Sequence, residues 1–103
     1  MKIYDVKVEL EARNDLYVGA EFYDEQEKGI GDYFWDSLLS DIESLLIYGG
    51  VHEIHYGFHR APSKRFPFFI YYFVEDNIVY VVAVLPMKEQ PILIETTLVE
   101  RKV

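Results

Sequence analysis

At 103 residues, the chain is long enough for one folded domain with a single hydrophobic core. Half of its residues are hydrophobic and 17% are aromatic, which excludes a disordered chain. The formal net charge of −8 argues against non-specific nucleic-acid binding, because affinity for phosphates comes mainly from Lys and Arg. The absence of cysteine excludes disulfides and thiolate metal sites.

The charge is unevenly distributed along the chain. Residues 1–53 hold four Lys or Arg and thirteen Asp or Glu, whereas residues 54–103 hold six and five. An anionic partner would therefore meet the C-terminal half, although acidic helices that are simply solvated explain the same asymmetry. With no apolar signal core and no apolar run of membrane-spanning length, the sequence predicts a cytoplasmic protein without a membrane partner.

The first half of the chain predicts a strand followed by two helices. Apolar and polar residues alternate through residues 2–10, as in a half-exposed strand, with Tyr4, Val6, Val8 and Leu10 on the apolar face. Residues 11–28 then follow helical spacing, with small or apolar residues at Ala12, Leu16, Gly19, Ala20 and Tyr23. Gly29-Ile30-Gly31 breaks this pattern. A second helix is expected from near Asp32 to Gly49-Gly50, with an apolar stripe at Phe34, Leu38, Ile42 and Leu45.

The second half predicts three strands. Residues 51–65 have strand features interrupted by Gly57 and Pro62, which favours an edge strand or a bulge. Residues 64–85 read as an antiparallel hairpin, KRFPFFIYYFVEDNIVYVVAVL, with a turn at Glu75-Asp76-Asn77. Residues 86–91 are irregular, and the tail at 92–103 has helical and strand features in equal measure.

These elements predict one α+β domain over residues 1–103, in the order β-α-α-β-β-β. Two amphipathic helices with a short connection form a helical hairpin, which we expect to cover one face of a small, mainly antiparallel four-stranded sheet. The two strands of the hairpin at 64–85 do not alternate regularly between apolar and polar residues. We therefore expect both faces of this hairpin to pack against other parts of the chain.

Two segments of the second half resemble the RelE/ParE toxin superfamily. They are HYGFHR at 55–60 and KRFPFFIYYFVEDNIVYVVAVL at 64–85, of which the R-F-P-F-x-I-Y-Y core is the specific part. The first half agrees through Ala12, Asp15-Leu16, Tyr23, the Gly-Ile-Gly break and Phe34. The likeness extends to Pro91 and is closer to the ParE, or plasmid-stabilisation, branch.

The resemblance implies the toxin of a bacterial type II toxin–antitoxin system. Such toxins are held inactive by a cognate antitoxin, which is the first expected partner. The ParE branch inhibits DNA gyrase, and the RelE branch cleaves messenger RNA on the ribosome. A homodimer and a toxin–antitoxin hetero-oligomer are both compatible with the sequence, and no motif predicts a cofactor.

Departures from the family pattern favour a ParE-like inhibitor over a ribonuclease. Where the family continues L-H-x-x-R-x-P, this chain has Pro86 in place of His and Glu89 at the basic position. The acidic composition also disfavours ribosome binding. A RelE-like ribonuclease remains the alternative, and a decayed toxin that still binds its antitoxin is a second one.

The candidate partner-binding residues are the cations Arg60, Lys64, Arg65 and Lys88. A metal-free ribonuclease needs cations to stabilise the charge that develops on the phosphate, so Arg60 and Arg65 are the candidate catalytic residues. No partner for them as general acid or base is recognisable. The structural alternative is that one Arg pairs with a helix carboxylate such as Asp15.

Two further patterns are interpreted as structural. His52, His55 and His59 invite a metal site, but His55 and His59 on one strand would lie about 13 Å apart, so no metal site is predicted. The aromatic run at 66–73 could stack on bases, but packing in the core is the favoured interpretation.

Overall fold

The computed structural model describes residues 2–102, which form nine elements around one sheet. In chain order they are β1 (Asp5–Val8), α1 (Leu10–Gln26), α2 (Ile30–Glu43), α3 (Leu45–Tyr48), β2 (Ile54–His55), β3 (Phe58–Pro62), β4 (Phe68–Glu75), β5 (Ile78–Pro86) and α4 (Pro91–Arg101). The predicted α+β class is confirmed. None of the helices within residues 2–102 has the length and apolar character needed to span a bilayer.

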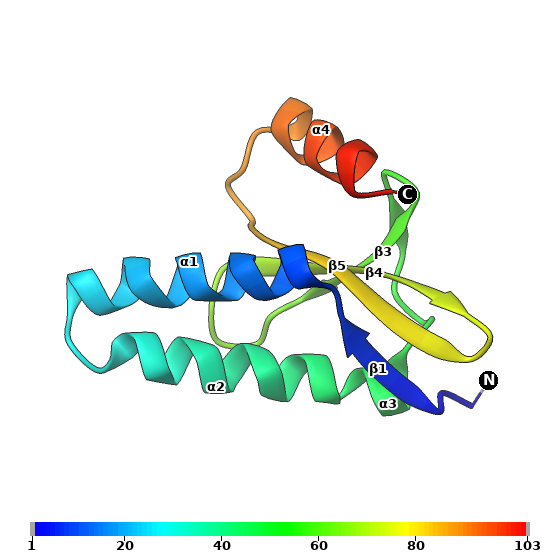
Figure 1. Cartoon of the computed structure of the whole chain (residues 1–103), viewed down its shortest axis with the longest axis horizontal. Helices are drawn as coiled ribbons and strands as arrows, with labels where there is room; N and C mark the ends of the chain where they lie inside the picture. The colour runs from blue at the N-terminus through cyan, green and yellow to red at the C-terminus, as the bar shows by residue number, and fades with distance from the viewer. Residues whose placement is uncertain (1, 103) are drawn as a thin grey trace.

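The sheet has five strands in the order β1-β5-β4-β3-β2, so the predicted number of four is wrong. β1 runs parallel to β5, and the other neighbours are antiparallel. The extra strand arises because Tyr56 and Gly57, at φ 57° and 86°, reverse the chain between β2 and β3. Both values are positive, as in two-residue hairpin turns. The single edge strand expected over 51–65 is therefore a small hairpin, which is visible at the edge of the sheet in Figure 1.

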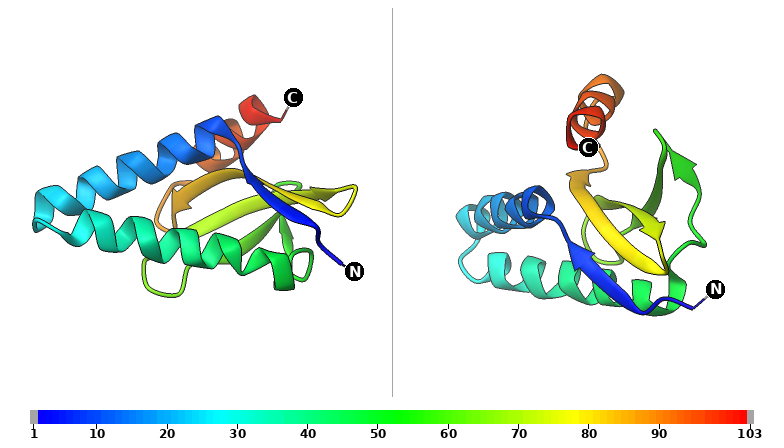
Figure 2. Two further views of the ribbon diagram at one scale, coloured as in Figure 1. Left: turned by 60° about the horizontal axis from the view of Figure 1, so that its bottom comes forward. Right: turned by 45° about the vertical axis from the view of Figure 1, so that its right-hand side comes forward.

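The helical hairpin covers one face of the sheet, as predicted (Figure 2). Its stripes are buried at Ala12, Leu16, Phe34, Leu38, Ile42 and Leu45. Gly19 is needed where the helices meet, because an added Cβ there would lie 2.6 Å from the Phe34 ring. The break between the helices comes two residues earlier than expected, at residues 27–29, and Ile30 and Gly31 already belong to α2. Gly29 has a φ of 98°, and Asp24 accepts hydrogen bonds from the backbone N–H groups of Gly29 and Gly31 at 2.8 and 3.2 Å.

The first strand is shorter than predicted. The chain leaves the sheet after Val8 and enters α1 at Leu10, which is 79% exposed. At the other end of the strand, Tyr4 is 69% exposed whereas Ile3 is buried. The expected apolar face therefore holds only for Val6 and Val8, because just four residues follow the alternation of a strand.

The C-terminal segment, whose sequence has helical and strand features in equal measure, forms helix α4. This helix covers the opposite face of the sheet (Figures 1 and 2). Its Ile94 and Leu98 pack among aromatic and aliphatic side chains of β3, β4 and β5. Pro91 opens the helix at a position where its missing N–H is not needed. Helices therefore pack on both faces of the β4–β5 hairpin, as its apolar sequence requires.

A bulge in β5 decides which side chains face α4. Tyr71 is opposite Ala83 and Tyr72 is opposite Val81, so Val82 is the extra residue. As a result, both Val82 and Ala83 belong to the core beneath α4, whereas Val81 and Val84 face α1 and α2.

Candidate partner-binding surfaces

Three of the four predicted cations lie in two neighbouring loops at one end of the sheet. Lys64 and Arg65 are exposed in the loop between β3 and β4, and Lys88 is exposed in the loop after β5. The Met87 N–H donates to the Pro67 carbonyl at 2.8 Å, which holds the two loops together. Residues far apart in the sequence therefore form one basic end.

Arg60 lies on β3, and its guanidinium carbon is 4.1 Å from the centroid of the Phe69 ring. This distance is typical of a cation–π contact, which orients the guanidinium without neutralising it. Arg60 is also the register partner of Tyr71 on β4, on the side of the sheet that α4 covers.

A buried carboxylate fixes the basic loop. Asp41 of α2 accepts a hydrogen bond from the Ser63 hydroxyl at 2.6 Å and another from the Lys64 backbone N–H at 3.2 Å. Asp41 is 7% exposed and Ser63 is 8% exposed. Because these contacts hold the backbone of the loop, the side chains of Lys64 and Arg65 are presented from a rigid base.

The Tyr71 hydroxyl is the one buried side-chain polar atom within residues 2–102 that makes no hydrogen bond. Burial raises the pKa of Tyr71, and the nearby Arg60 only partly opposes that shift. The phenol is therefore neutral near pH 7, and it is suited to donate a hydrogen bond rather than to act as a general base.

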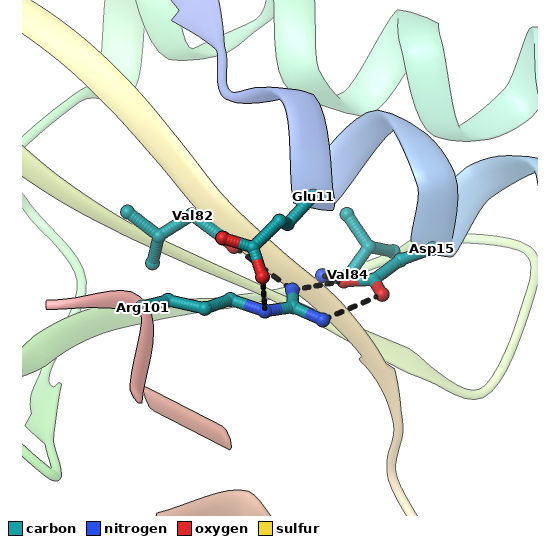
Figure 3. Close-up of polar contacts among 5 residues, drawn as sticks. All are labelled: Glu11, Asp15, Val82, Val84 and Arg101. Carbon is teal, nitrogen blue, oxygen red and sulfur yellow. Dashed lines mark hydrogen bonds and ion pairs between the residues drawn. The ribbon is translucent and has the colours of Figure 1, made fainter. Parts of the chain in front are cut away.

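Asp15 does not pair with any of the predicted cations. Its partner is Arg101 of α4, whose two terminal nitrogens lie 2.6 and 3.0 Å from the two carboxylate oxygens of Asp15 (Figure 3). Arg101 also donates to the Val82 carbonyl at 3.0 Å, and Asp15 accepts from the Val84 N–H at 2.9 Å. These contacts satisfy backbone groups of β5 beyond the end of β1 and tie α4 to α1.

The alternative that one of the predicted cations pairs with Asp15 is therefore wrong. Arg101 was not identified from the sequence as the partner of Asp15. One signal was available. Ile94, Leu98 and Arg101 fall on one face at helical spacing, so a helical tail would place Arg101 beside the apolar stripe. The hydrogen bonds with Asp15 are the main cause that raises the pKa of Arg101, so Arg101 keeps its positive charge.

The histidines connect the β2–β3 hairpin to β4. His52 Nδ1 lies 2.6 Å from the Tyr72 hydroxyl, and His59 Nδ1 lies 2.6 Å from the His52 carbonyl. Burial and then the nearby His59 lower the pKa of His52. His55 lies on β2, not on one strand with His59, because the Tyr56-Gly57 turn separates them. Among residues 2–102, no three His, Asp or Glu side chains are placed to hold a metal ion.

The aromatic run 66–73 packs mainly in the core, as predicted. Phe66, Phe68 and Tyr72 face the helical hairpin, where Phe66 and Phe68 contact Phe34 at ring-centroid distances of 5.0 and 4.9 Å. Phe69, Tyr71 and Phe73 face α4. The run therefore builds both cores and does not form an exposed stacking platform.

A groove of about 560 Å³ opens between α1 and the basic end of the sheet. One wall is formed by Val18 and Phe22 of α1, which are 61% and 55% exposed. The opposite wall contains Pro67, Pro86 and Lys88. An apolar groove of this size with a few charged groups at its rim has the form of a preformed binding site.

The sequence matches no protein family and no curated protein. Its structure is similar to a solved chain described as "Chromosomal ParDE TA system from P. aeruginosa". The TM-score is 0.73 at 12% sequence identity, over 82% of this chain and 96% of that chain. The likeness is one of fold, and it agrees with the fold that the RelE/ParE resemblance implied.

Proposed function

We propose that this protein is the toxin of a type II toxin–antitoxin system, that it inhibits a cellular protein by binding it, and that a cognate antitoxin neutralises it. The observation that carries the proposal is the fold shared with a chain of a ParDE system across most of both chains. The sequence resemblance to the RelE/ParE superfamily supports it independently, because that resemblance rests on residues and not on topology.

DNA gyrase is the proposed target, as the resemblance to the ParE branch implies. The basic end formed by Lys64, Arg65 and Lys88 is the proposed contact surface, together with Arg60. It is the main concentration of positive charge on an otherwise acidic chain. A rigid, charged rim of this kind favours rapid and specific association with an acidic surface of a partner protein.

The RelE-like alternative is favoured by one observation, which is the position of Arg60 beside the unpartnered Tyr71 hydroxyl. A guanidinium and a neutral phenol could together stabilise the charge that develops on a phosphate during RNA cleavage. This site lies under α4, so an RNA would reach it only if the helix moved. Arg65 lies in the loop beyond the end of β3 and would contact the RNA backbone.

Growth after induction tests the proposal. The chain is expressed alone in bacteria and together with a small protein encoded beside its gene. We expect growth arrest in the first case and normal growth in the second. Arrest with cleavage of messenger RNA that disappears in Arg60→Ala and Arg65→Ala proteins would favour the ribonuclease. A folded protein that binds the neighbouring protein but never arrests growth would instead identify a decayed toxin.

A further inference from the structure

Four residues near the β2 edge of the sheet form a chain of hydrogen bonds that fastens the β2–β3 hairpin to β4. The Gly50 N–H donates to the Tyr72 hydroxyl at 2.9 Å, and this hydroxyl lies 2.6 Å from His52 Nδ1. His59 Nδ1 donates to the His52 carbonyl at 2.6 Å, and the His59 ring stacks on the Tyr72 ring at a centroid distance of 4.9 Å. We call Gly50, His52, His59 and Tyr72 the histidine latch.

The partners in the histidine latch assign its hydrogens. A carbonyl oxygen can only accept, so His59 Nδ1 carries a hydrogen. Burial raises the pKa of Tyr72, so its phenol stays protonated near pH 7. Because the Tyr72 oxygen accepts from Gly50, its own hydrogen is directed to His52 Nδ1. The latch therefore requires a neutral His52, whereas His59 can take up a proton on Nε2 and keep its bond.

A proton on His52 Nδ1 removes the acceptor of the Tyr72 hydroxyl. Two donors, from Gly50 and His52, would then point at one oxygen. Tyr72 is 0% exposed, so water does not replace the lost partner of its hydroxyl hydrogen. A buried hydroxyl hydrogen without an acceptor is unfavourable. The charged form of His52 is therefore incompatible with a closed latch.

The groups around His52 do not stabilise its charged form. His59 of β3 and Tyr72 of β4 are the titratable groups that face it from the strands packed against it. Burial and then the nearby His59 lower the pKa of His52. Over residues 2–102, no carboxylate lies within ion-pairing distance of His52, and the adjacent Glu53 is exposed and pairs with His55 at 3.8 Å.

The segment that the latch fastens has few other contacts with the core. Val51 and Ile54 are 72% and 57% exposed, so little apolar surface is uncovered if this segment leaves the sheet. Its backbone pairs with β3 through β2 and through the Arg60 N–H, which donates to the Glu53 carbonyl at 3.0 Å. The Arg60 side chain lies over the Phe69 ring on the face beneath α4, away from the latch. A segment held mainly by polar contacts can open locally without unfolding the whole protein.

We propose that protonation of His52 opens the histidine latch, so that residues 50–57 detach from β3 while the rest of the sheet stays folded. β3 then becomes the edge of the sheet, with unpaired backbone groups. This pH-sensitive switch is a property of the fold and does not depend on the proposed function. A histidine in water has a pKa of about 6.5, so proton uptake by the open form alone raises the open fraction about tenfold between pH 7.5 and 5.5.

Amide hydrogen exchange of the full chain tests the switch, followed by NMR at pH 7.5 and 5.5 and corrected for the pH dependence of intrinsic exchange. The Arg60 N–H is the reporter, because its acceptor is the Glu53 carbonyl in the segment that detaches. We expect its protection to fall about tenfold at pH 5.5. At both pH values its protection should be weaker than that of the β4 and β5 amides and insensitive to low urea, as for a local opening. Unchanged protection at pH 5.5, or protection equal to that of β4 and β5, would overturn the inference.

Two matched variants assign the effect to His52. His52→Asn keeps a side-chain oxygen that can accept from Tyr72 but does not titrate, so the protection of the Arg60 N–H should no longer fall at pH 5.5. His55→Asn makes the same change at the histidine of β2 and should keep the tenfold response. A response that survives in His52→Asn, or disappears in His55→Asn, would overturn the switch. An NMR titration of the wild type needs no substitution: a His52 ring that takes up its proton above about pH 6.5 in the folded chain would also overturn it.

Discussion

Replacing Arg101 by Met should destabilise the protein strongly, although only one described residue, Lys102, follows Arg101. The side chains of Arg101 and Asp15 are 15% and 12% exposed, and they form a two-point ion pair. Removing one member of a buried pair leaves the other charge without a partner, which typically costs about 3–5 kcal/mol. Asp15 would keep its hydrogen bond from the Val84 N–H, so we expect the lower end, about 3 kcal/mol.

The free energy of unfolding in urea measures this effect, and a double-mutant cycle isolates it. Asp15→Asn keeps an oxygen to accept from Val84 but removes the charge, so the pair Asp15→Asn with Arg101→Met should recover at least about 1 kcal/mol relative to the sum of the single changes. Lys102→Met is the matched control, because Lys102 is exposed and adjacent. A loss below about 1 kcal/mol in Arg101→Met, or strict additivity in the cycle, would refute a stabilising role for the pair.

Two other predictions concern the core and pH. Gly19→Ala should lower the free energy of unfolding by about 1–2 kcal/mol, because a clash with the buried Phe34 ring outweighs the gain in helix propensity; urea unfolding that shows a more stable protein would contradict the tight packing. His52 has a lowered pKa in the folded state, so the unfolded chain binds more protons as the pH falls through about 6.5. The contribution of His52 to stability is therefore present above that pH and lost below it, and thermal unfolding from pH 7.5 to 5.5 should show a steeper decline for the wild type than for His52→Gln.

The core stripes of the two helices could be predicted from the sequence because helical periodicity is repeated over several turns. Phe34, Leu38 and Ile42 recur over two turns of one helix, and no other element competes for them. The long hairpin was predictable for a similar reason. Its two apolar runs are separated by Asp76 and Asn77, which tolerate the positive φ values of 52° and 62° found in the structure.

The short strand β2 could not be predicted because it depends on two backbone angles. Tyr56 adopts a positive φ, which is uncommon for an aromatic residue. Gly57 is therefore the one residue at this turn whose type indicates a reversal of the chain.

The contacts that organise the candidate surfaces are long-range, and sequence patterns do not contain them. Asp15 and Arg101 are 86 positions apart, and Asp41 holds a loop that begins 22 residues later. Periodicity places such residues on an element but does not choose their partners. The basic end could be predicted as a set of residues, whereas the groove required the structure because its walls come from α1 and two distant loops.

Inhibition of DNA supercoiling by gyrase tests the central claim most directly. The purified chain is added to gyrase and relaxed plasmid, with a Lys64→Glu, Arg65→Glu protein as the contact variant. Lys7→Glu is the control, because Lys7 is an exposed cation on β1 whose register partner on β5 is Tyr80, six residues before Pro86. We expect the wild type and the control to inhibit supercoiling, and we expect the contact variant to inhibit it at least tenfold less well, since two charge reversals at one surface cost about 1.4 kcal/mol or more. Unimpaired supercoiling at a saturating concentration of a folded chain that nevertheless arrests growth would contradict the account.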